Sequence, residues 1–238
     1  VWKFGGTSVG KPERMKSIRQ LITEDGQPKI VVLSALSGST NTLLSISESL
    51  NAGNAAEAKS KASELRAHYD QFLTELYSTP AGLGQGQAIV AKEFTFIDSL
   101  IATSPYTVKQ EKEMVALGEL LSTQIFEAFL QEEGISSALL PALDFMVIDE
   151  DNEPILKVIE QKLAAVLAPV KDKQIFVTQG FICRNPEGEV DNLKRGGSDY
   201  TASLIANYLD AEELQNYTHV DGIYTANPEL VTDAKKID

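Results

Sequence analysis

The chain has 238 residues, 43% of them hydrophobic and 23% charged, and its formal net charge is −13. This length and composition are typical of one large α/β domain or of two closely packed lobes. The negative charge disfavours nucleic acid and anionic membranes as partners, and no apolar run reaches membrane-spanning length. The only cysteine, Cys183, excludes an internal disulfide and indicates a reducing, cytoplasmic compartment.

The first predicted element is a short strand over residues 1–4, which leads directly into a loop of glycines and hydroxyl side chains. Such a loop is typical of a phosphate cradle, with Lys3 as a positive charge at its edge. It is not a Walker P-loop, because the lysine precedes the glycines. Taken alone, this stretch is explained about equally well as an ordinary turn.

Helical spacing of Met15, Ile18, Leu21 and Ile22 predicts a helix before a second strand at residues 29–33. A serine-rich loop over residues 34–41 and another helical pattern follow. This alternation predicts a parallel sheet, and it places both polar loops at the carboxyl edge of that sheet, where open α/β folds bind ligands.

Residues 55–134 are predicted to be mostly helical, with helices over 55–77 and 108–129 and a loop over 78–86, where Pro80 is followed by three glycines. Gly118 interrupts the second helix and indicates that another segment approaches it closely. From the residues alone, the neighbouring Glu119 is best explained as a solvated helix-face residue.

Further strands are predicted at residues 137–140, 145–148 and 174–178, with a helix at 157–167. Residues 185–188 form a turn signal between two extended runs. Cys183 lies in an apolar run, which indicates a packed thiol rather than a nucleophile.

The most informative segment is 195–202, where an arginine, two glycines, Ser198 and Asp199 precede a helical pattern. Arg195 can hold a carboxylate or phosphate with paired hydrogen bonds. Asp199 adds the opposite charge, which indicates catalysis on an anionic substrate or a substrate that carries both charges. Residues 218–224 follow another predicted strand and weakly indicate a nucleotide-binding edge.

In combination, these motifs resemble the aspartokinases of the amino acid kinase superfamily. The matching segments are 3–10, 32–41, 117–120, 178–181, 195–202 and 220–225, in the family's order. The resemblance implies a three-layer α/β/α sandwich around a central, mostly parallel sheet, as in carbamate kinase. It also implies a catalytic domain over 1–238, truncated at its C-terminus and without ACT regulatory domains. Residues 1–174 would form an aspartate-binding lobe containing the helical segment 55–134, and residues 175–238 would start a nucleotide-binding lobe.

The implied reaction moves the γ-phosphoryl group of ATP to the side-chain carboxylate of L-aspartate, giving 4-phospho-L-aspartate. This reaction is the first step of lysine, threonine and methionine biosynthesis. Mg²⁺ would be carried by ATP, with no metal ligand from the protein, and the full-length protein is expected to form a homo-oligomer. Lys3 and Asp199 would be catalytic, the lysine neutralising charge and the aspartate orienting it. The resemblance also implies binding roles for the other site residues. Glu119 would bind the ammonium of aspartate, Arg195 its α-carboxylate, and Thr40 and Ser198 the acceptor carboxylate. The phosphate oxygens would be bound by Gly5, Gly6, Thr7 and Ser8, and the nucleotide would be bordered by Thr218, His219 and Tyr224.

Two alternatives remain open. One is another carboxylate kinase of the superfamily, acting on glutamate or acetylglutamate. The other is a non-catalytic homologue that only binds a ligand. Glu119 together with Arg195 favours a free amino acid that bears both charges.

Overall fold

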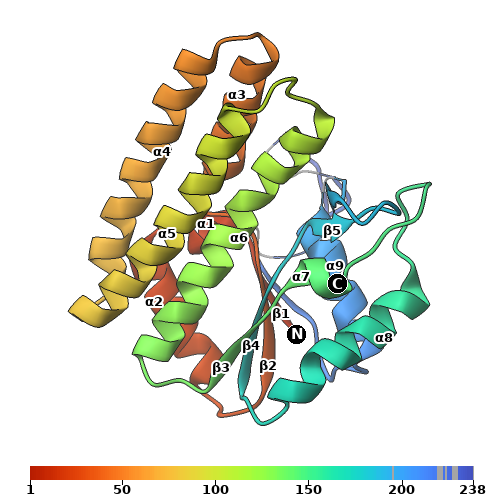
Figure 1. The fold of residues 1–238 in the computed structure, drawn as a ribbon. Coiled ribbons are helices and arrows are strands. Elements are labelled where there is room, and N and C mark those ends of the chain that lie inside the picture. The colour runs from red at the N-terminus through yellow and green to blue at the C-terminus, as the bar shows by residue number, and fades with distance from the viewer. Residues whose placement is uncertain (195, 219–221, 223, 227–229, 238) are drawn as a thin grey trace.

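The computed structural model describes residues 1–194, 196–218, 222, 224–226 and 230–237. Within this part of the chain, a five-stranded parallel sheet has the strand order β3-β4-β2-β1-β7 (Figure 1). The parallel strands predicted near both ends of the chain therefore lie in one sheet. Its strands are β1 (Trp2–Phe4), β2 (Lys29–Leu33), β3 (Ser137–Leu140), β4 (Ile175–Gln179) and β7 (Gln215–Tyr217).

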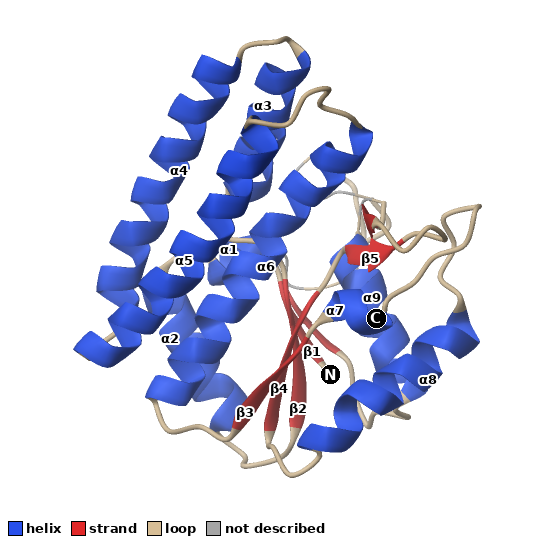
Figure 2. Ribbon diagram, in the orientation of Figure 1, coloured by secondary structure: helices blue, strands red, loops and turns tan. Residues whose placement is uncertain are grey.

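Helices cover both faces of the sheet, which confirms the predicted three-layer architecture (Figure 2). In β2, Val31 and Leu33 point into a hydrophobic core shared with one helical layer, and Ile30 and Val32 point into the core shared with the other. All five residues of β2 are buried, as expected for a central parallel strand. The first layer contains α2 (Pro12–Thr23), α3 (Ser39–Asn51), α4 (Ala55–Leu76), α5 (Pro80–Ile101) and α6 (Val108–Glu132), and the second contains α7 (Ala142–Phe145), α8 (Leu156–Leu167), the 3₁₀ turn η1 (Ala168–Val170) and α9 (Gly197–Tyr208).

The predicted loop over residues 78–86 is wrong, because α5 begins at Pro80 and includes all three glycines. The Thr79 side chain caps this helix by accepting the N–H of Gly82 at 3.0 Å. A Cβ atom on Gly82 would lie 2.3 Å from Glu132, and one on Gly86 would lie 2.5 Å from the Tyr77 ring. These two glycines allow α5 to pack closely against its neighbours, so they reflect tertiary contact rather than a turn.

The predicted strand over residues 145–148 is also wrong. Phe145 ends the short helix α7, and Val147 and Ile148 form only isolated bridges, to Arg184 and Pro154. The Gln179 side chain at the end of β4 accepts the N–H of Ala142 at 2.7 Å and so holds the start of α7. This contact from a distant strand favours a helical turn that the local apolar pattern does not reveal.

The predicted turn at residues 185–188 is confirmed. It joins β5 (Ile182–Arg184) to β6 (Val190–Asn192) in an antiparallel hairpin. Cys183 is buried in this hairpin, as expected for a packed thiol, and burial raises the pKa of its thiol to about 12. The predicted lobes share one sheet, since β4, which starts at Ile175, lies between β2 and β3. Among the described residues, no helix combines the length and the apolar character needed to cross a membrane.

Candidate active site

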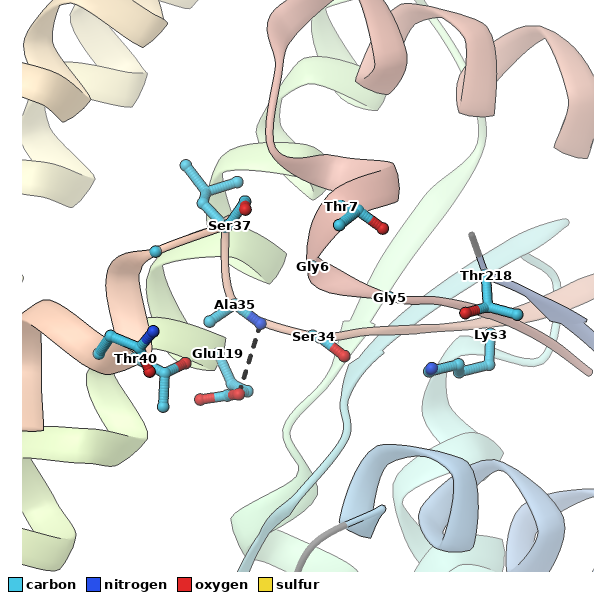
Figure 3. A pocket seen from close by; sticks show the side chains of 13 residues that line it. Lys3, Gly5, Gly6, Thr7, Ser34, Ala35, Ser37, Thr40, Glu119 and Thr218 are labelled. Carbon is cyan, nitrogen blue, oxygen red and sulfur yellow. Dashed lines mark hydrogen bonds between the residues drawn. The ribbon is translucent and has the colours of Figure 1, made fainter. Parts of the chain in front are cut away.

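A cavity of about 400 Å³ lies at the carboxyl ends of β1 and β2 (Figure 3). The loop after β1 leads into the short helix α1 (Gly6–Val9), and the serine-rich loop after β2 leads into α3. A Cβ atom on Gly6 would lie 3.0 Å from the carbonyl oxygen of Ala35, so the two loops meet closely. This position confirms the predicted carboxyl-edge location. The cavity is lined by Lys3, Gly5, Gly6, Thr7, Ser34, Ala35, Leu36, Ser37, Gly38, Thr40, Asn41, Glu119 and Thr218.

The two residues predicted to be catalytic lie together although 196 positions separate them in sequence. Lys3 Nζ lies 2.7 Å from Asp199 Oδ1; the lysine side chain is 9% exposed and the aspartate side chain 49% exposed. Asp199 lies in the first turn of α9, where the helix dipole favours a negative charge. The preceding Gly196 has φ +83°, a left-handed conformation that lets the chain turn into this helix.

Asn216 supports the same contact and was not identified from the sequence. It is the register partner of Lys3 in the β1–β7 ladder, and its Nδ2 donates to Asp199 Oδ1 at 3.0 Å. Asp199 is thereby held by two neighbouring strands. Nothing in the local pattern of β7 indicates this role, because it depends on pairing between the two ends of the chain.

Glu119 is not the solvated residue that its surroundings in the sequence favour. It is 4% exposed and lines the cavity from α6, on the other side of Ser34 from Lys3 in Figure 3. Its Oε1 accepts the N–H of Ala35 at 3.4 Å, and its Oε2 has no hydrogen-bond partner among the described residues. Burial raises the pKa of this carboxyl to about 8. A cationic group entering the cavity would provide the missing partner.

Gly118 explains how Glu119 reaches the cavity. A Cβ atom at this position would lie 2.8 Å from the Cβ of Ala35 and 3.7 Å from Thr40 Oγ1. The predicted close approach is therefore confirmed, and the approaching segment is the loop after β2 with the start of α3. Thr40 lies beside Glu119 in this contact (Figure 3).

Ser198 reaches the edge of the same site through Ser34, a residue to which the sequence assigned no role. The hydroxyl of Ser34 donates to Ser198 Oγ at 3.1 Å. A Cβ atom on Gly180 would lie 2.5 Å from the Ser198 Cβ, so the residue that follows β4 packs directly against the start of α9. The sequence predicted that the loop over residues 34–41 offers hydroxyl groups to a ligand. Only the fold shows which of its serines, Ser34, contacts Ser198.

The four residues predicted to bind phosphate, Gly5, Gly6, Thr7 and Ser8, differ in whether they line the cavity and in what their polar groups contact. Gly6 and Thr7 begin α1, so their N–H groups lie at the open end of a helix, and both residues line the cavity. Gly5 also lines it, but its N–H donates to the Tyr217 carbonyl at 3.3 Å. The Ser8 hydroxyl, 3.5 Å from the same carbonyl, does not line the cavity. The phosphate roles of all four residues, Gly5, Gly6, Thr7 and Ser8, remain predictions.

The predicted nucleotide border is only partly described. Thr218 lines the cavity beside Lys3 (Figure 3). Tyr224 forms an isolated bridge with Lys236 and is not among the lining residues. Arg195 and His219 lie outside the described residues, so their roles stay predictions.

The arrangement combines a buried ammonium, helix-end N–H groups and hydroxyls at one end with a buried carboxylate at the other. The first set can bind phosphate oxygens and developing negative charge, whereas Glu119 can bind a cation. A small molecule that carries an amine and a carboxylate could contact both ends. Among the described residues, no group of three or more His, Cys, Asp or Glu side chains could hold a metal ion.

A model of the amino acid kinase family matches residues 1–238. The chain is 32% identical over 243 residues to the lysine-sensitive aspartokinase 3 of Escherichia coli, covering 100% of this chain and 53% of that protein. It is 29% identical over 247 residues to the chloroplastic aspartokinase 1 of Arabidopsis thaliana, covering 43% of it. The structure of E. coli aspartokinase III in complex with aspartate and ADP superposes with a TM-score of 0.83 at 31% identity, covering 100% of this chain and 53% of that one. The chain thus spans about half the length of the curated relatives that it matches.

Proposed function

Because the chain belongs to the amino acid kinase family, we propose that it forms catalytic machinery of an aspartate kinase, which transfers the γ-phosphoryl group of ATP to the side-chain carboxylate of L-aspartate. The observation that carries this proposal is one cavity lined both by Lys3, paired with Asp199, and by the buried Glu119. The similarity to aspartokinases supports the choice of substrate.

The acceptor needs positioning more than activation. A carboxylate is already ionised at neutral pH, so its oxygen can attack the γ-phosphorus while the bond to the bridging oxygen of ADP breaks. Glu119 would bind the ammonium of aspartate and thereby fix the distance of the side-chain carboxylate from the phosphate loop. Thr40, which lies beside Glu119, and Ser198, which lies beside Ser34, would hold the acceptor carboxylate.

Lys3 would stabilise the charge that builds up on the transferring group. Its ammonium has three N–H donors and one faces Asp199, which leaves others for phosphoryl oxygens. Asp199 and Asn216 would orient that ammonium, and no proton abstraction is required of Asp199. Gly6 and Thr7 would add N–H donors at the start of α1.

Mg²⁺ would be bound by the phosphate oxygens of ATP and would reach the site together with the nucleotide. This proposal follows from the chemistry of Mg²⁺, which usually keeps several waters and binds substrate phosphates rather than a cage of protein ligands. Arg195 is proposed for the α-carboxylate on its motif alone. The division into an aspartate-binding and a nucleotide-binding lobe, and the homo-oligomer, also remain proposals.

The test is an acceptor panel on the full-length protein. ATP, Mg²⁺ and either L-aspartate, L-glutamate or N-acetyl-L-glutamate would be incubated with the enzyme, with ADP followed and the acyl phosphate trapped by hydroxylamine. We expect ADP and trapped product with aspartate, and a large loss of both in Asp199→Asn. Turnover with glutamate or acetylglutamate instead would reassign the substrate. Calorimetric binding of aspartate without turnover would identify a non-catalytic ligand-binding protein.

A further inference from the structure

Two ion pairs connect the β5–β6 hairpin to the first half of α6. Lys112 on α6 pairs with Asp191 on β6, and the side chain of Asp191 is only 5% exposed. One helical turn earlier, Lys109 pairs with Glu189 at 2.9 Å, and both of these side chains are much more exposed, at 45% and 37%. The Lys112 side chain is itself 31% exposed. The chain therefore offers one ion pair whose carboxylate is buried and one whose two partners are both exposed.

The Lys112–Asp191 pair lies on the helix face that leads to the proposed site. Lys112, Ala116 and Glu119 are spaced four and three residues apart, so they form one stripe along α6. Ala116 is buried in the hydrophobic core that also contains Ile182, the first residue of β5, and Leu193, which follows β6 directly. The hairpin thus packs along the same stripe that presents Glu119 to the cavity.

A short and tightly packed path leads from Asp191 to the start of α9. The Asp191 carboxylate accepts the N–H of Asn192 at 2.7 Å, and the N–H of Leu193 donates to Phe181 at 2.7 Å. A Cβ atom on Gly197 would lie 2.8 Å from the Leu193 Cβ, so Leu193 and the start of α9 are in direct packing contact. Ser198 follows directly. A displacement of Asp191 would consequently be passed to Ser198.

We propose that Lys112 is a positioning residue for substrate binding: through its ion pair with Asp191, it sets the separation between Glu119 on α6 and Ser198 at the start of α9. This inference rests on the proposed function, in which these two residues bind opposite ends of aspartate. Removing the lysine leaves a buried carboxylate without its cation, and the hairpin must then move toward water. The exposed Lys109 pair lacks this penalty, because solvent can replace either partner.

The test compares Lys112→Met with the matched control Lys109→Met in the full-length protein. Each variant removes one positive charge from the same helix and one ion pair to the same hairpin. We expect Lys112→Met to raise KM for aspartate about tenfold, with kcat and KM for ATP within about threefold, because uniform binding of aspartate is weakened. Lys109→Met should leave all three constants within about twofold of wild type. Lys112→Arg, which keeps the charge, should restore most of the aspartate KM.

A double-mutant cycle with Asp191→Asn tests whether the two side chains act through one contact. The double variant should then have an aspartate KM close to that of Lys112→Met, rather than the product of the two single effects. An aspartate KM unchanged in Lys112→Met, or raised equally in Lys109→Met, overturns the proposal, and so does a lowered melting temperature without any change in KM.

Failure of the proposed function would be recognised separately, because the wild-type enzyme would then release no ADP with aspartate. In that case, amide hydrogen exchange tests whether the Lys112–Asp191 ion pair positions the start of α9. Lys112→Met should accelerate exchange of the backbone amides at the start of α9, and Lys109→Met should not. Equal exchange in both variants would rule out a positioning role for Lys112.

Discussion

We expect the buried carboxyl of Glu119 to make the binding of aspartate, the proposed substrate, dependent on pH. Burial raises its pKa to about 8, so at pH 6 only about 1% of the side chain is ionised. If Glu119 binds the ammonium of the substrate, the ionised form is required, and each pH unit below 8 costs about 1.4 kcal/mol of binding free energy. The dissociation constant of aspartate should therefore fall about 50-fold between pH 6 and pH 8, and by a further factor of about two before it levels off above pH 8.

The assay is calorimetric titration of aspartate into the full-length protein over this pH range, in buffers of different ionisation enthalpy. Wild-type protein should release close to one proton per bound aspartate at pH 6. In Glu119→Gln the pH dependence should disappear, and above pH 8 binding should be about 10- to 100-fold weaker, since a charged hydrogen bond is lost. Glu127→Gln is the control, because Glu127 is also buried on α6 but bonds Gln131 and Ser137.

Stability provides an independent check with a defined sign. The folded carboxyl titrates at about 8 and the ordinary value is 4.5, so the folded state binds more protons between these values. The unfolding free energy contributed by this group is consequently greatest below pH 4.5 and falls by up to about 1.4 kcal/mol per unit as pH rises toward 8. Glu119→Gln should remove this fall in urea titrations. A wild-type affinity that is flat from pH 6 to 8, or a slope retained by the variant, refutes the reasoning.

Three further predictions concern Lys3 and the close packing of two helices. Lys3→Met should lower kcat by about 100-fold or more, with a smaller effect on KM for aspartate, because its ammonium acts on the transferring group; steady-state kinetics decide, and a pure KM effect would contradict the assignment. Gly118→Ala should weaken aspartate binding and destabilise the fold by about 1–3 kcal/mol, since its Cβ would lie 2.8 Å from Ala35; unchanged calorimetric binding and melting would disprove this close contact. In α5, Gly86→Ala should destabilise the protein, whereas Gly84→Ala, with nothing within 4 Å, should stabilise it by about 0.5–1 kcal/mol; urea unfolding of the two variants should move in opposite directions.

Glycine serves different structural purposes at different positions of this chain, so its presence alone did not predict whether a segment is a loop or a helix. At Gly196, a glycine followed by a hydroxyl side chain indicated a tight turn, and the structure has one there. After β1 the predicted loop is only Gly5, because Gly6, Thr7 and Ser8 belong to the short helix α1. At Gly82 and Gly86 the same residue type permits close helix packing, so the loop predicted there is wrong. The sequence alone does not separate these cases, because the contacting atoms come from other elements.

The sequence by itself determined the parallel α/β pattern, the carboxyl-edge position of both polar loops and the types of charge in the site, because strand periodicity and loop chemistry are local properties. Only the tertiary structure decided which of these groups meet. It buried Glu119 beside Ala35, joined Ser34 to Ser198 and placed Asn216 beside the Lys3–Asp199 pair. The physical reason is that burial and pairing depend on elements that lie far apart in the chain, and β1 and β7 bring its two ends together in one sheet.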